Sequence, residues 1–204
     1  MVAKIISLLA AYLIGSINTS IIVSKIMTGD DIRNHGSGNA GATNTLRTVG
    51  KLGALFVVIG DALKAVISIV LARLITKNDA DAVYIAGMGV VLGHNFPVFF
   101  GFKGGKGVLV SLVAMLFADW RIGLVTAAIA IAIMVISRYV SLGSILGAVI
   151  FIAMSLIFHT GDSKFVVFSI MLSGLVIYMH RTNIVRLVRG TENKTSFKKS
   201  ESKK

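Results

Sequence analysis

Long apolar segments dominate this chain and restrict it to few folds. A helix needs about 20 mostly apolar residues to cross a bilayer, and the segments 3–26 and 52–75 meet that requirement. Five shorter apolar segments follow, at 83–93, 108–118, 122–137, 144–158 and 165–179. We therefore predict an all-α membrane protein: a bundle of about seven transmembrane helices, with short re-entrant or interfacial loops between them.

The charged residues support a membrane location. They make up 15% of the 204 residues, whereas soluble domains carry about 25%. The net charge of +12 raises the question of nucleic acid. However, the basic residues flank apolar segments or crowd the C-terminal tail, which is typical of membrane topology signals rather than of a nucleic-acid surface. The absence of cysteine excludes disulfides and thiol nucleophiles.

The distribution of lysine and arginine predicts an orientation. If seven segments span the membrane, the polar clusters and the C-terminus share one side. Of the 21 basic residues, Lys64 lies within a span and five lie on the opposite side: Lys4, Arg73, Lys77, Arg121 and Lys164. The positive-inside rule then places the N-terminus outside and the clusters in the cytoplasm. We expect an integral domain at 1–190 and a basic, disordered cytoplasmic tail at 191–204.

The first polar cluster, residues 36–47, is rich in hydrogen-bond donors. Its glycines, including Gly41, leave backbone N–H groups free to converge on an anion. Arg47 adds a planar fork suited to phosphate. The other side-chain donors are Ser37, Asn39, Thr43 and Asn44. An ordinary surface loop is the alternative, but so many donors before a helix favour an anion site.

The second cluster also fits a phosphate. It contains Gly101, Lys103, Gly104, Gly105, Lys106 and Gly107. It is not a P-loop, because Phe100 replaces the first glycine and Gly107 replaces the serine or threonine. ATP hydrolysis is therefore unsupported, whereas a small phosphorylated substrate suits a glycine loop with a lysine. The alternative, glycines for tight helix packing, fits Gly87, Gly89 and Gly93 better.

The remaining candidate residues belong to two further polar clusters, at 138–144 and 180–183, and to one charged pair inside a predicted span. Ser144 follows a basic residue at a helix end, and His180 and Asn183 share a helix face by their i, i+3 spacing. His180 is a donor, a general base or a simple interfacial histidine. Asp61 and Lys64, also i, i+3, lie inside a span, so a structural ion pair is favoured over a catalytic role.

Familiar catalytic motifs are missing. The sequence has no H-E-x-x-H and no G-x-S-x-G, and its two glutamates, Glu192 and Glu201, both lie in the tail. This favours a reactive substrate and electrostatic stabilisation, with no metal and no cofactor. A secondary transporter of a small organic phosphate is the alternative. The short chain and the position of the clusters at one interface weigh against it.

Four sequence strings resemble the signature motifs of one family. They are GSGNAGATNTLR at 36–47, GHNFPVFFGFKGGKGV at 93–108, RYVSLGS at 138–144 and HRTNIVRLVRGTENK at 180–194. In this order they resemble the bacterial acyl-phosphate:glycerol-3-phosphate acyltransferases. The resemblance covers nearly the whole chain, up to about Lys194.

The resemblance implies a multi-pass enzyme of the bacterial cytoplasmic membrane with its active site facing the cytoplasm. It would transfer a fatty acyl group from acyl phosphate to the 1-hydroxyl of sn-glycerol 3-phosphate. The products would be lysophosphatidate and phosphate, in the first acylation step of phospholipid synthesis. Its partners would be these two substrates, membrane lipids and the enzyme that supplies acyl phosphate, but no nucleic acid.

The resemblance also implies roles for residues. The essential serine and arginine of the first motif match Ser37 and Arg47. The glycine loop that binds glycerol phosphate matches 101–107 with Lys106. The important serine, histidine and asparagine match Ser144, His180 and Asn183, and a mainly structural glutamate matches Glu192. We assign Ser37, Arg47 and His180 to catalysis and the remaining donors of the four clusters to substrate binding.

Overall fold

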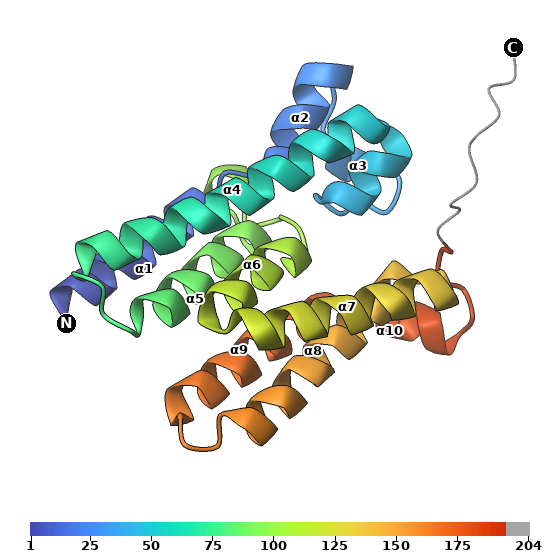
Figure 1. The fold of residues 1–204 in the computed structure, drawn as a ribbon. Helices are drawn as coiled ribbons and strands as arrows, with labels where there is room; N and C mark the ends of the chain where they lie inside the picture. The colour runs from blue at the N-terminus through green and yellow to red at the C-terminus, as the bar shows by residue number, and fades with distance from the viewer. Residues whose placement is uncertain (195–204) are drawn as a thin grey trace, which may run out of the picture.

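Helices make up all the regular structure in the part of the chain that the computed structural model describes, residues 1–194 (Figure 1). The prediction of an all-α fold is confirmed. The elements are α1 (Val2–Gly15), α2 (Thr19–Thr28), η1 (Ile32–Asn34), α3 (Ala42–Thr48), α4 (Lys51–Ile75), α5 (Ala82–Asn95), η2 (Val98–Phe100), α6 (Val108–Ala118), α7 (Trp120–Ser137), α8 (Val140–Phe158), α9 (Ser163–Met179) and α10 (Arg181–Val188).

The number of membrane spans is smaller than predicted when length is the criterion. Within residues 1–194, five helical segments are long and apolar enough to cross, and a sixth span results if α9 and α10, bent by 60°, count as one. The 11 residues of α6 extend about 16 Å at 1.5 Å per residue, about half the thickness of the hydrocarbon core. The count of seven is therefore not confirmed, and the orientation stays a prediction.

The first span is broken where the sequence predicted a continuous helix over 3–26. α1 ends at Gly15 and α2 starts at Thr19. Asn18 lies between them in an extended conformation, and its side-chain oxygen accepts a hydrogen bond from the N–H of Ile21 at 3.1 Å. A capped helix start inside the apolar segment leaves the carbonyl of Ile17 outside the helical hydrogen-bond pattern, available to another partner.

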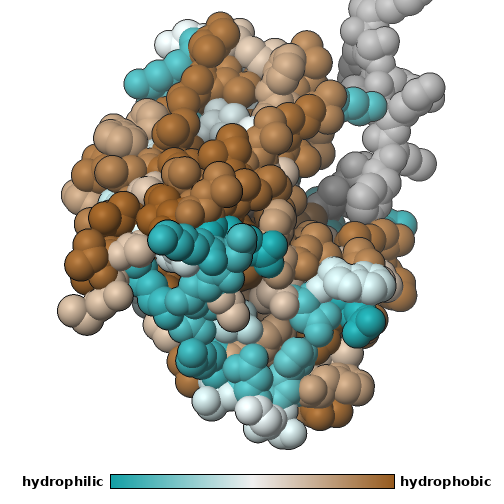
Figure 2. All heavy atoms as spheres, turned by 60° about the vertical axis from the view of Figure 1, so that its left-hand side comes forward, coloured by the Kyte–Doolittle hydropathy of each residue, from teal (hydrophilic) through white to brown (hydrophobic). Residues whose placement is uncertain are grey.

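The outer surface of the bundle is apolar. Apolar side chains cover much of the face in Figure 2, and hydrophilic ones gather in a patch. Large apolar side chains are exposed on the long helices, among them Leu55, Phe56, Leu63, Ile131, Ile136, Leu156 and Met171. In water so large an exposed apolar surface would drive association. It fits a chain whose outer helix faces contact lipid.

Small residues let α1 and α5 pack at close range. A Cβ added at Gly89 would lie 2.8 Å from the carbonyl oxygen of Leu8, and one at Gly93 would overlap the carbonyl oxygen of Tyr12. Gly15 approaches the backbone of Val90 from the other side. Small residues spaced for backbone approach are typical of membrane helix pairs. The packing role considered for Gly89 and Gly93 is thus confirmed.

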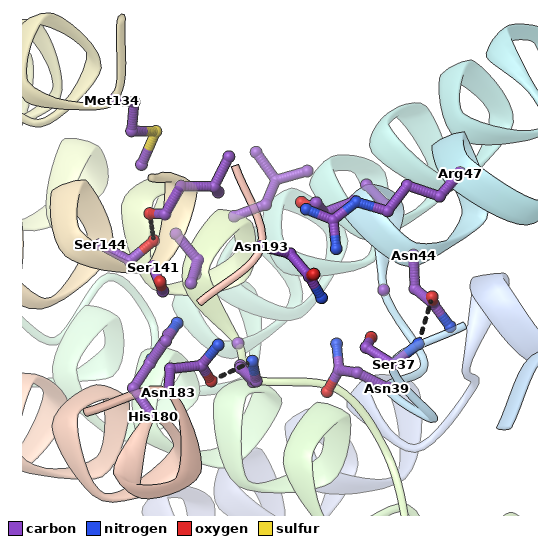
Figure 3. Close-up of a pocket in the computed structure, with 18 of the residues that line it drawn as sticks. Ser37, Asn39, Asn44, Arg47, Met134, Ser141, Ser144, His180, Asn183 and Asn193 are labelled. Carbon is purple, nitrogen blue, oxygen red and sulfur yellow. Dashed lines mark hydrogen bonds between the residues drawn. The ribbon is translucent and has the colours of Figure 1, made fainter. Parts of the chain in front are cut away.

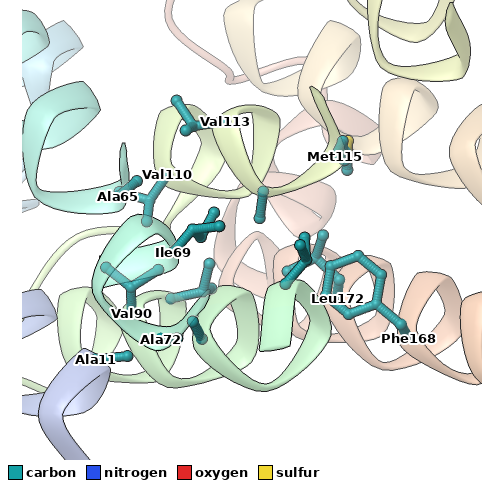
Figure 4. Close-up of a cluster of buried hydrophobic side chains, with 14 of the residues drawn as sticks. Ala11, Ala65, Ile69, Ala72, Val90, Val110, Val113, Met115, Phe168 and Leu172 are labelled. Carbon is teal, nitrogen blue, oxygen red and sulfur yellow. The ribbon is translucent and has the colours of Figure 1, made fainter. Parts of the chain in front are cut away.

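The buried apolar core joins two groups of helices. Ala11, Ile69 and Val90 come from the first group, α1, α4 and α5, and Leu172 comes from α9 in the second group, α7, α8 and α9 (Figure 4). The short helix α6 packs against members of both groups. Figure 1 shows α2, α3 and α10 toward one end of the bundle and the N-terminus at the other.

The chain after α10 is partly built into the fold. The predicted tail starts at residue 191, but Glu192 accepts hydrogen bonds from Ser141 and Asn183, so the described residues 191–194 are not a free tail. The remainder of the predicted tail, 195–204, lies outside the described residues.

Candidate active site

All four polar clusters meet at one cavity of about 310 Å³. The predicted residues that line it are Ser37, Asn39, Gly41, Thr43, Asn44, Arg47, Asp61, Lys106, Gly107, Ser144, His180, Asn183 and Glu192. Figure 3 shows Ser37, Asn39 and Arg47 on one side of this space, with Ser144 and His180 on the other. The predicted residues that do not line it are Gly101, Lys103, Gly104, Gly105 and Lys64.

The buried side chain of Asn44 holds the loop of the first cluster in place. Its side-chain oxygen accepts the N–H of Ser37 at 3.0 Å, and its amide nitrogen donates to the carbonyl of His35 at 2.9 Å. Gly36 and Gly38 have φ values of 58° and 71°, in the left-handed region that glycine tolerates. The loop is therefore folded around a buried amide. It leaves Ser37 and Arg47 exposed at the cavity.

The second cluster is held mainly by backbone contacts. Gly104 and Gly105 donate their N–H groups to the carbonyls of Asn95 and His94, both at 3.1 Å. Arg33 donates to the carbonyls of Phe100 at 2.7 Å and Lys103 at 3.1 Å. Two of the N–H groups expected to receive a phosphate are thus already engaged. The loop instead positions Lys106 at the cavity.

A chain of hydrogen bonds links Lys106 to the C-terminal segment. Its Nζ donates to Oδ1 of Asn183 at 2.5 Å, and Nδ2 of Asn183 donates to Oε1 of Glu192 at 2.7 Å. Ser141 donates to the same oxygen at 2.8 Å, and Arg186 donates to Oε2 at 2.8 Å. Glu192 thus ties α8 and α10 to the second cluster, as a structural residue would.

The charges around Lys106 make it an unusual lysine. Burial lowers the pKa of Lys106 to about 8, with Arg186 and Arg47 adding repulsion and Glu192 partly opposing it. Burial alone would raise the pKa of Glu192, but hydrogen bonds from Arg186, Asn183 and Ser141 hold it below its usual value. Glu192 therefore stays ionised among several cations, and the site retains a positive potential for an anion.

His180 and Ser144 contribute from the other side of the cavity. Nδ1 of His180 lies 2.8 Å from the carbonyl oxygen of Val176. A carbonyl only accepts, so Nδ1 carries the proton and Nε2 is the basic nitrogen. Ser144 donates to the carbonyl of Val140 at 3.0 Å within its own helix. Its oxygen still has lone pairs for a ligand donor.

The cavity also has an apolar wall, which the sequence did not predict. It is lined by Val58, Leu109, Leu112, Met134 and Val140. The cavity is also lined by three residues that were not predicted as site residues: Ser141, Asn193 and His94. Ser141 precedes Ser144 by three residues on one helix, so their shared face was a usable signal.

The predicted ion pair inside the first helix group is confirmed. Nζ of Lys64 lies 2.8 Å from Oδ1 of Asp61, and both side chains are buried. Asp61 also lines the cavity. Within residues 1–194, no group of three or more histidine or acidic side chains is arranged to hold a metal ion.

Comparison with known proteins identifies the family. The glycerol-3-phosphate acyltransferase family matches this chain over residues 5–190. A glycerol-3-phosphate acyltransferase of Clostridioides difficile is 45% identical over 201 residues, covering 96% of this chain and 97% of the relative. One from Thermoanaerobacter sp. strain X514 is 43% identical over 194 residues, covering 95% and 96%.

Solved structures agree in fold as well as in sequence. The chain is similar to PlsY (YgiH), an integral membrane glycerol 3-phosphate acyltransferase, in its glycerol 3-phosphate form. The identity is 35% and the TM-score 0.87, covering 95% of this chain and 96% of the other. The lysophosphatidic acid form gives 33% and 0.81, covering 95% of each chain. This multi-pass membrane chain therefore belongs to the glycerol-3-phosphate acyltransferase family, and it is an acyltransferase.

Proposed function

We propose that this acyltransferase uses acyl phosphate as its donor and acylates the 1-hydroxyl of sn-glycerol 3-phosphate, giving lysophosphatidate and phosphate. The observation that carries the proposal is the mixed character of one cavity. Arg47 and Lys106 line the same cavity as an apolar wall that includes Leu112 and Met134. A fatty chain with an anionic head matches both halves. Membership of an acyltransferase family removes the support for a transporter.

The chemistry requires positioning more than a strong nucleophile. The 1-oxygen of glycerol 3-phosphate attacks the acyl carbon, and the bond from that carbon to the phosphate oxygen breaks as phosphate leaves. We assign the hydroxyls of Ser37 and Thr43, with those N–H groups of the first cluster that have no partner in the described residues, to the acyl phosphate and to the charge growing on its leaving group. Arg47 and Lys106 hold glycerol 3-phosphate nearby, so that much of the rate gain comes from proximity.

The hydroxyl proton has two acceptors within this scheme. One is the phosphate that leaves, and the other is the basic Nε2 of His180. A pH–rate profile of His180→Ala separates them. Near-normal turnover at saturating substrate eliminates His180 as the base, whereas the loss of one limb of the profile assigns the proton to it.

The donor is tested with purified protein in detergent. We expect phosphate release and a lysophosphatidate product with acyl phosphate and glycerol 3-phosphate, and no product when acyl-CoA replaces the donor. Activity with acyl-CoA alone would overturn the proposed donor. The reaction needs no sealed compartment, so product formation in this assay also argues against the alternative of a secondary transporter.

Cysteine labelling tests the proposed cytoplasmic site in sealed vesicles. Single cysteines at Ser37 and Lys106 are expected to react from the same side, the one that corresponds to the cytoplasm. Labelling of the two positions from opposite sides would contradict a shared active site.

A further inference from the structure

The wall of the cavity contains a buried histidine that the proposed reaction does not use. His94 is only 4% exposed, yet it lines the cavity beside the first cluster. It lies near the end of α5, next to the glycine loop. A Cβ added at Gly105 would overlap Nε2 of this ring. His94 is therefore packed against the residue before Lys106.

Lys64 fixes the tautomer of this ring. Its ammonium group has three protons, and it lies 2.8 Å from Asp61 Oδ1, 3.0 Å from the carbonyl oxygen of Ile17 and 2.9 Å from Nδ1 of His94. Each of the first two can only accept, so the third proton is directed at Nδ1. A neutral ring that accepts at Nδ1 carries its own proton on Nε2.

Asp61 supports the same arrangement. Its Oδ1 lies 3.6 Å from Nδ1 of His94, farther than Lys64, and it also accepts from Thr19 at 3.1 Å. A doubly protonated ring would bring a second cation to within 2.9 Å of the lysine, which costs free energy in a buried site. The geometry therefore favours the neutral ring.

The proton on Nε2 lacks a partner in the protein. Among residues 1–194, the hydrogen bonds of His94 involve Nδ1 and the backbone only. A donor at the cavity wall that has no acceptor in the protein is available to an acceptor supplied by a ligand. Lys106 and Arg47 line the same cavity, and their charges favour an anionic ligand.

We propose that His94 is a further substrate-binding residue: its Nε2–H donates a hydrogen bond to a substrate phosphate in the cavity, and Lys64 and Asp61 are positioning residues that hold this tautomer. The inference rests on the proposed function for the identity of the phosphate. In this proposal Lys64 does more than pair with Asp61: its hydrogen bond to Nδ1 holds the neutral ring of His94 with its proton on Nε2.

Nitrogen NMR of the protein labelled with ¹⁵N-histidine tests the tautomer directly. The chain has only four histidines, so His94→Gln identifies the signal by its loss. We expect the Nε2–H tautomer, and a shift of the Nε2 resonance when glycerol 3-phosphate or inorganic phosphate is added. Finding Nδ1–H, or no shift with glycerol 3-phosphate, inorganic phosphate or an acyl phosphate, would overturn the proposal. Comparing these ligands shows which phosphate is bound.

Kinetics gives the second measurement. His94→Ala is expected to raise the KM of the substrate whose phosphate it binds by roughly 10-fold, the effect of one lost hydrogen bond to a charged group. His94→Gln, which keeps an N–H donor and an acceptor, is expected to recover most of that loss. An equal fall of kcat for both variants with unchanged KM would indicate a structural role only and contradict the proposal.

His159→Gln is the matched control. Nε2 of His159 lies 3.0 Å from Oδ2 of Asp119, and the ring stacks on Phe165, away from the cavity. The KM values of the His159→Gln enzyme are therefore expected to equal those of the wild type. If the wild-type protein transfers no acyl group but His94 still responds to phosphate, the proposed function fails and the phosphate site stands. If transfer is normal and His94 does not respond, only this inference fails.

Discussion

The two ends of the bundle both collect lysine and arginine, but they use them differently. At the end that holds the N-terminus, Lys4 lies 2.6 Å from Asp81 and 3.0 Å from Asp79, and Lys164 lies 2.9 Å from Asp81. Lys4 and Lys164 thus each contact a carboxylate just before α5, and these ion pairs fasten helix ends together.

At the cavity end the cations outnumber the carboxylates. Glu192 is paired with Arg186. Within residues 1–194, no carboxylate lies within ion-pair distance of Arg47 or Lys106. Lys106 is instead held by the neutral amide of Asn183. A cation oriented by an amide keeps its charge available to a ligand, whereas one oriented by a carboxylate does not. The two ends therefore differ in the groups that contact their lysines, carboxylates at one end and an amide at the other, and not in the lysines themselves.

The largest effect is expected from Arg47→Ala. It removes the planar cation that faces the cavity, and we expect kcat/KM to fall by about 10²–10³-fold, as for the loss of one donor to transition-state charge. The acyl-transfer assay measures it. Arg47→Lys keeps the charge without the planar fork, so we expect its kcat/KM to lie between those of the wild type and of Arg47→Ala. Wild-type activity in Arg47→Lys would contradict the assigned role.

A smaller loss is expected from Glu192→Gln. The amide preserves the shape of the side chain but removes the charge that Arg186 and Asn183 contact. We expect kcat/KM to fall by roughly 10-fold, the effect of weakening hydrogen bonds to a charged group, together with a lower melting temperature. Asp119→Asn, at the opposite end, is the control that should leave transfer unchanged. Equal effects of both variants would remove the contrast between the ends.

The pH dependence of glycerol 3-phosphate binding should follow Lys106. Burial lowers its pKa to about 8, so the cation is present below that pH and is lost above it. We expect kcat/KM for glycerol 3-phosphate to decline as pH rises through about 8. Lys106→Arg, whose guanidinium stays protonated, should remove this decline. A decline that persists unchanged in Lys106→Arg would assign it to another group.

The smallest effect is expected from Lys164→Ala at the paired end. This side chain is largely exposed and contacts only Asp81 among the acidic groups of the described residues. Exposed ion pairs contribute little to stability. Acyl transfer and melting temperature should both stay close to those of the wild type. A clear loss of transfer would show that the paired end also influences the site.

The sequence predicted the site better than it predicted the spans. The four motifs and the Asp61–Lys64 pair were readable because glycine, arginine and intramembrane charges have specific physical uses. The break between α1 and α2 was not predicted, since Ser16 and Asn18 look like a polar stripe on a continuous helix. The engagement of the N–H groups of Gly104 and Gly105 was also not predicted, because their partners are carbonyls of α5, and no local rule of the sequence gives such contacts.

By itself the sequence determined the class of the protein: its apolar segments require a helical membrane fold, and its donor-rich clusters predict an anion site. Only the tertiary structure decided which donors remain free. Whether an N–H, an ammonium or an imidazole is available depends on what the packed helices place beside it. Lys64 and His94 are 30 residues apart and meet at 2.9 Å, a contact created by helix packing and not by any pattern in the chain.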